Sequence, residues 1–109
     1  MQISLDNAVA GFIGYMADLV MQIPKTGDRF LGFMALGSLK SNPAILVSKV
    51  RPWLEMSGIL TENMVNLDAA RAALDMAFAN VPRVSYFGFS FTSDDVPALL
   101  AKMQGMEAV

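Results

Sequence analysis

The sequence predicts a mainly α (α+β) protein, with about five helices packed around one core and a small antiparallel sheet. Five segments carry apolar residues every three or four positions, the pattern of amphipathic helices. Prolines and glycines separate these segments. The stretch "RVSYFGFSF" (83–91) instead reads as two short strands around a Phe-Gly turn. At 109 residues, the chain 1–109 is expected to form a single globular domain.

The first helix is expected over about 4–22. Ser4 is a good N-cap residue, and Pro24 ends the segment. Gly11 and Gly14 lower the helix propensity, so we expect them to mark a close contact with another helix. Its apolar stripe consists of Leu5, Val9, Phe12, Met16, Leu19 and Ile23.

The second helix, 26–40, has apolar residues on every side of the helical wheel. Thr26 is expected to cap it, and Asp28 suits the positive end of the helix dipole. The apolar residues are Phe30, Leu31, Phe33, Met34, Leu36 and Leu39. A helix of this kind is either central in a core or covered by a partner.

The third helix begins at Pro43, with Asn42 as its expected cap. Pro52 lies inside this apolar run and has no N–H to donate, so a kink or break is expected near Arg51. Gly58 is a typical C-terminal stop.

A clean amphipathic pattern predicts a helix over about 67–80, and a last helix follows Thr92 and Asp95, which form a variant of the capping box. The strands are expected at 83–86 and 89–91. The short extended piece at 64–66 is either separate from this hairpin or joined to it as a third strand. The last helix has a stripe of Val96, Leu99, Leu100 and Met103.

The aromatic residues of the hairpin allow two interpretations. Phe89 and Phe91 fall on one face of a strand and are expected to seal the sheet onto the helices. Tyr86 and Phe87 lie at the turn and are candidate anchors for a partner protein.

Arg51 and Trp53, beside the internal proline, form the second candidate site. They are interpreted either as a groove wall or interface anchor, or as a tryptophan that covers one end of the core.

The composition argues against common kinds of catalysis. The chain has no histidine and no cysteine, which are the usual general base and nucleophile. Asp94 and Asp95 are adjacent, but helix N-termini favour acidic residues in any case. We therefore expect no catalytic residues, no metal and no cofactor, with an enzyme based on Asp or Tyr as the weakest hypothesis.

Charge and hydropathy limit the kinds of partner and the location that we expect for this protein. The net charge of −2 argues against nucleic acid, although the stretch 24–52 carries five cations against one acid, and whether it binds anything stays open. No positively charged segment precedes the first apolar run, and that run is too short to cross a membrane. We expect a cytoplasmic protein without a membrane span.

The apolar excess predicts the function. Hydrophobic residues make up 54% of the chain and charged residues 17%, which is below the usual quarter. A small domain has too little interior to bury so many hydrophobic residues, so we expect a homo-oligomer. The leading hypothesis is a self-associating protein–protein interaction module, with another protein as a further candidate partner, in a bacterial or prophage-type accessory role. The alternative is a helical module that binds a small molecule or lipid in an apolar cavity.

Overall fold

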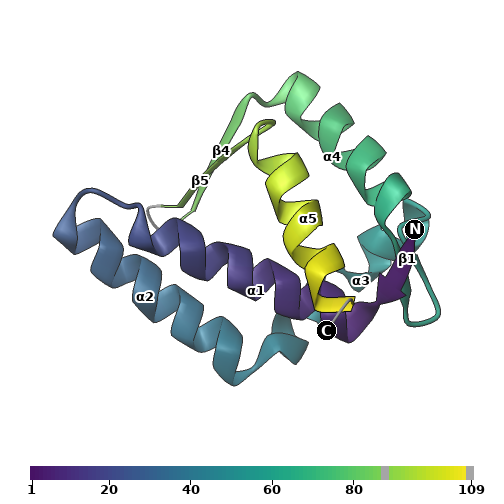
Figure 1. The fold of residues 1–109 in the computed structure, drawn as a ribbon, viewed down its shortest axis with the longest axis horizontal. Helices are drawn as coiled ribbons and strands as arrows, with labels where there is room; N and C mark the ends of the chain where they lie inside the picture. The colour runs from purple at the N-terminus through teal and green to yellow at the C-terminus, as the bar shows by residue number, and fades with distance from the viewer. Residues whose placement is uncertain (87–88, 108–109) are drawn as a thin grey trace.

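The computed structural model describes residues 1–86 and 89–107, and within these ranges the chain forms five helices and five short strands (Figure 1). The helices are α1 (Leu5–Met21), α2 (Thr26–Ser41), α3 (Pro43–Met56), α4 (Leu67–Asn80) and α5 (Asp95–Glu107). The strands are β1 (Gln2–Ser4), β2 (Leu60–Thr61), β3 (Met64–Asn66), β4 (Arg83–Tyr86) and β5 (Phe89–Thr92). The predicted mainly helical α+β fold is confirmed.

The strands form two separate antiparallel sheets. β3 is the middle strand of a three-stranded sheet, in which its Val65 lies opposite both Ile3 of β1 and Leu60 of β2. β4 pairs only with β5, as the predicted hairpin. Of the two arrangements left open by the sequence, the joined one is therefore wrong, because the segment 64–66 is already paired on both of its edges.

Several predicted helix ends are confirmed. Ser4 Oγ accepts a hydrogen bond from the Asn7 N–H at 3.2 Å, which caps α1. The Thr92 N–H donates to the Asp95 carboxylate at 2.7 Å before α5. Gly58 follows α3 with a φ of 74°, a left-handed conformation that costs glycine little.

The predicted cap at Thr26 and the predicted break at Pro52 are wrong, and Asn42 is confirmed as the N-cap position of α3 but without a side-chain hydrogen bond. Thr26 is already the first residue of α2, and neither Lys25 nor Asn42 makes a side-chain cap hydrogen bond. α3 runs through Pro52 without a break. Pro52 and Ser48 are both exposed, so water can hydrogen-bond to the Ser48 carbonyl that the proline leaves without a donor.

The core consists of two clusters of buried side chains. The larger contains Ile3, Ala8, Ile59, Leu60, Val65, Leu67, Ala70, Val96 and Leu100, where the three-stranded sheet meets α1, α4 and α5. The smaller contains Met16, Val20, Leu36 and Phe89, between α1, α2 and the hairpin. The Phe89 ring is buried and stacks on Phe91, with ring centres 6.4 Å apart. The prediction that these phenylalanines seal the hairpin onto the helices is confirmed.

α1 and α5 cross in close contact at the glycines that the sequence marks. A Cβ at Gly11 would lie 2.4 Å from Met103 Cα, and one at Gly14 would lie 3.0 Å from Lys102 Cε. Only a residue without a side chain fits at Gly11. α2 lies along α1 at one edge of the molecule, away from α4 and α5 (Figure 1).

Candidate functional site

The outward side of α2 is an apolar surface that nothing in the described chain covers. Phe30 is 64% exposed and Met34 is 57% exposed, whereas Gly32 and Leu36 on the opposite side are buried. We call this surface the α2 outer face; it consists of Gly27, Phe30, Leu31, Phe33, Met34, Gly37 and Ser41. The expectation that α2 is central in the core is met on its inner side only.

The middle of the α2 outer face carries no charge. At 100° per residue, Gly27, Phe30, Met34, Gly37 and Ser41 form one stripe along the helix. Arg29 and Lys40 flank this stripe on one edge, and the Arg29 Nε–H donates to the Ile23 carbonyl at 3.0 Å. The stripe is thus available for packing against another apolar helix.

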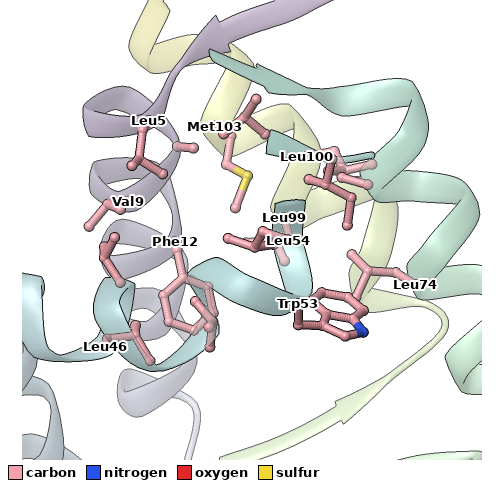
Figure 2. A pocket seen from close by; sticks show the side chains of 16 residues that line it. Leu5, Val9, Phe12, Leu46, Trp53, Leu54, Leu74, Leu99, Leu100 and Met103 are labelled. Carbon is pink, nitrogen blue, oxygen red and sulfur yellow. The ribbon is translucent and has the colours of Figure 1, made fainter. Parts of the chain in front are cut away.

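A second apolar site lies under α3. Every residue of α3 is described, and none of them is buried, although five apolar side chains share its inner side: Leu46, Val47, Val50, Trp53 and Leu54. These side chains face α1, α4 and α5 across a cavity of about 260 Å³ (Figure 2). We call this space the α3 cavity. Its lining is wholly apolar.

The α3 cavity has a neighbour of about 360 Å³ between α4, α5 and the hairpin. Phe12, Leu74 and Leu99 line both spaces. The predicted apolar stripes of α1, α4 and α5 therefore lie partly on cavity walls. Leu5, Val9 and Phe12, expected in the core, are half-buried for this reason.

The predicted site residues do not converge on one place. Trp53 is half-exposed and lines the α3 cavity, as a groove wall would. The Arg51 guanidinium instead donates to Glu55 at 3.3 Å and to Asn63 at 3.2 Å, which ties α3 to the β2–β3 turn. The Tyr86 backbone pairs with Phe89. The Tyr86 side chain and the whole of Phe87 lie outside the described residues.

One buried titratable group joins three elements. The Tyr15 hydroxyl of α1 donates a hydrogen bond to Asp95, whose carboxylate also accepts the Thr92 N–H at the end of β5. Burial, and then the hydrogen bond to Asp95 and the negative charges of Asp95 and Asp18, hold the pKa of Tyr15 far above its ordinary value. A tyrosine held in its protonated form in this way does not act as a base near neutral pH. Its role here is to join α1, the hairpin and α5.

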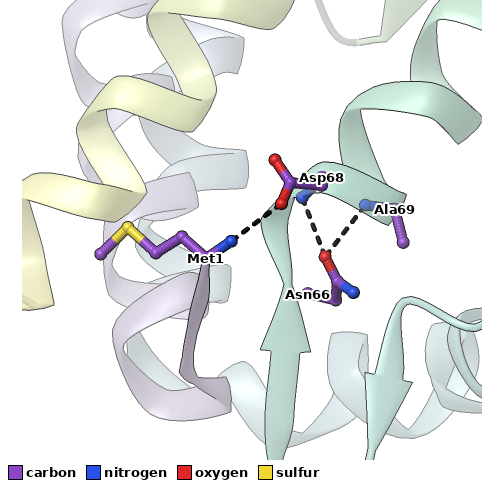
Figure 3. Close-up of polar contacts among 4 residues, drawn as sticks. All are labelled: Met1, Asn66, Asp68 and Ala69. Carbon is purple, nitrogen blue, oxygen red and sulfur yellow. Dashed lines mark hydrogen bonds and ion pairs between the residues drawn. The ribbon is translucent and has the colours of Figure 1, made fainter.

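A polar corner lies where β1 and β3 meet α4 (Figure 3). Asn66 Oδ1 accepts from the N–H groups of Asp68 and Ala69 at 3.0 and 3.1 Å. The Met1 ammonium donates to the Asp68 carboxylate at 2.9 Å, and this hydrogen bond and charge lower the pKa of Asp68. Both partners are exposed, so the contact orders the end of β1 and adds little stability.

Among the residues that the structure describes, no single helix is long and apolar enough to span a membrane, and α2 with α3 reaches that length and composition only as a pair bent by 83°. Comparisons with protein-family models, with characterised proteins and with solved structures find no match. The α2 outer face and the α3 cavity are both apolar, and the described residues leave them uncovered or unfilled.

Proposed function

We propose that this protein is a self-associating interaction module without enzymatic activity, and that two copies pair through the α2 outer face. The observation that carries the proposal is the order in which large apolar side chains and glycines follow each other along that face. Gly27, Phe30, Met34, Gly37 and Ser41 follow each other at alternating spacings of three and four residues, which is the seam of a packed helix pair.

The seam is self-complementary when two copies of α2 run antiparallel. With the two-fold axis between Phe33 and Met34, Phe30 of each copy lies opposite Gly37 of the other. Phe33 then lies opposite Met34 of the second copy. Each phenylalanine of the face thus meets a gap or a flexible thioether, which lets identical surfaces pack about a two-fold axis.

Gly37 leaves room beside α2 for a partner to approach closely. Inside a helix, glycine costs about 1 kcal/mol relative to alanine. At Gly32 this cost has a structural reason, because a Cβ would lie 3.2 Å from Ile23 Cδ1. At Gly37 a Cβ would meet no atom of another described residue within 4 Å. Gly105 of α5 is equally open, but Gly37 lies among the exposed side chains of Phe30, Phe33 and Met34. A second apolar helix can therefore lie close to α2 at Gly37.

Cysteine cross-linking tests this geometry, because the natural chain contains no cysteine. In the proposed pair, the two copies of Met34 lie next to the symmetry axis, within reach of a disulfide. We expect Met34→Cys to form a disulfide-linked dimer under mild oxidation at micromolar concentration. Met76→Cys on α4 is the control, since Met76 is even more exposed than Met34, at 71% against 57%, but lies outside the interface. Equal cross-linking of the two variants would contradict the proposal.

Salt dependence separates self-association from binding to an acidic protein. Arg29 and Lys40 lie on the same edge of the seam, so antiparallel copies bring like charges near each other. Added salt should therefore strengthen self-association, because it screens this repulsion. An acidic partner on the same face would be released by salt instead. The cytoplasmic location stays a prediction from the sequence.

A further inference from the structure

We propose that the α3 cavity binds the hydrocarbon chain of a medium-chain carboxylate such as a fatty acid. This activity is separate from pairing through α2, because the α2 outer face contributes no residue to the cavity lining.

The lining excludes polar occupants. All of its side chains are hydrocarbon or thioether except the indole of Trp53, whose nitrogen points away from the cavity (Figure 2). Water against these walls would find no hydrogen-bond partner in the protein, so an apolar molecule can displace it with little loss of hydrogen bonding. The lining residues are Leu5, Ala8, Val9, Phe12, Leu46, Val47, Val50, Trp53, Leu54, Ile59, Val65, Ala70, Leu74, Leu99, Leu100 and Met103.

The shape of the cavity favours a thin chain over a second protein. Its floor reaches buried residues of the larger core cluster, including Ile59, Val65 and Ala70. An α-helix with its side chains is about 10 Å wide, too wide to enter a space of about 260 Å³ beneath α3. An engineered apolar cavity of about 150 Å³ binds benzene, so this volume suits a chain of about ten carbons.

The charges of α3 favour an acidic head group at the opening. α3 carries Lys49, Arg51 and Glu55, and since Arg51 forms an ion pair with Glu55, Lys49 leaves the helix with a net charge of +1. A carboxylate at the opening would be attracted to this net positive helix, whereas an ammonium head group would be repelled. With the chain in place, the inner side of α3 would bury the apolar surface that it now exposes.

Trp53 is the single tryptophan of the chain, so its fluorescence reports on the α3 cavity alone. We would titrate the full chain with saturated carboxylates of six to fourteen carbons, below their micelle concentrations. Each added methylene should tighten binding about fourfold up to about ten carbons, after which the affinity levels off. Decylammonium should bind more weakly than decanoate. Equal affinity of the two would contradict the carboxylate assignment, and a response independent of chain length would overturn the cavity proposal.

Two variants of α3 locate the binding. Val50→Phe fills the cavity from its wall and should weaken decanoate binding at least tenfold. Ile45→Phe makes a similar change on the outer side of the same helix and should leave binding unchanged. Equal effects of the two would contradict the assignment. The length series on the natural chain decides the question if Val50→Phe does not fold.

Phe30→Glu separates this proposal from the pairing through α2. It should keep decanoate binding while pairing is lost. If binding appeared only in this variant, a second copy would occupy the cavity in the natural protein, and the fatty-acid proposal would be wrong.

Discussion

Gly11 in α1 and Gly37 in α2 both lie inside long helices, where glycine lowers stability, but their surroundings differ completely. A side chain at Gly11 would collide with the backbone of Met103 in α5, whereas one at Gly37 would meet open space. The first glycine is explained by the fold of its own chain. The second leaves open space beside α2, where we propose that a second copy packs.

The same contrast extends to the two halves of the molecule. α1 and α5 make the most extensive contact between helices, and each contributes buried side chains. α2 turns four large apolar side chains outward, and α3 buries none of its residues. One half of the molecule thus buries its apolar side chains against its own helices, whereas the other half leaves apolar side chains exposed.

Adding a single methyl group should lower the stability most where α1 and α5 are in close contact. Gly11→Ala should destabilise the protein by about 2 kcal/mol, because its Cβ would overlap with the Met103 backbone and the gain in helix propensity only partly offsets this strain. Urea unfolding measures the change. An unchanged unfolding midpoint would show that α1 and α5 are not in close contact.

Tyr15→Phe tests how α1, the hairpin and α5 are joined. Loss of the hydrogen bond to the Asp95 carboxylate should cost about 1.5 kcal/mol. The raised pKa of Tyr15 adds a pH signature. In the natural protein this stabilisation is complete below about pH 10, where unfolded tyrosine is also protonated. It is lost as the pH rises from there through the folded pKa.

The unfolding free energies of both proteins, measured between pH 8 and pH 11.5, check this pH signature. The difference between the natural protein and Tyr15→Phe should shrink above pH 10. A constant difference would contradict the buried position of the Tyr15 hydroxyl.

Gly37→Ala should change the free energy of unfolding in the opposite direction to Gly11→Ala, which sharpens the comparison of the two glycines. Under conditions where the chain is monomeric, it should raise the unfolding free energy by about 0.7 kcal/mol through helix propensity. Its Cβ should also weaken pairing, because Phe30 of the second copy lies opposite. Gly105→Ala on α5, equally open, is the control and should leave pairing unchanged. Stronger pairing of Gly37→Ala would show that this glycine is not at a close contact.

The smallest expected effect is at the corner of β1 and α4. The lowered pKa of Asp68 means that its contact with the Met1 ammonium stabilises the fold above the ordinary aspartate pKa near 4. This contribution is lost as the pH falls through the folded pKa. Asp68→Asn should therefore reduce the loss of stability below pH 4 slightly, as followed by acid unfolding. A steeper acid loss in the variant would contradict the contact.

Features with a strong local signal could be predicted from the sequence. These include the helices, the hairpin, the Ser4 cap and the close contact at Gly11, each of which depends on neighbouring residues or on a repeating pattern. β1 and β2 could not be predicted, because strands of three and two residues are too short to show alternation. β3 is no longer than β1, and only the turn before it indicated an extended piece. The α3 cavity was also out of reach of the sequence. Hydrophobic spacing shows that Leu5, Val9 and Phe12 face inward, but not whether the space opposite them is filled.

The measurement that tests the central claim most directly is the absolute mass in solution by light scattering on a sizing column, over a wide dilution series. We expect a dimer that dissociates on dilution. The Phe30→Glu variant should be monomeric at every concentration while keeping its helical signal, because Phe30 is largely exposed within the monomer. A natural chain that is monomeric at all concentrations, or a Phe30→Glu variant that still forms the dimer, would contradict pairing through α2.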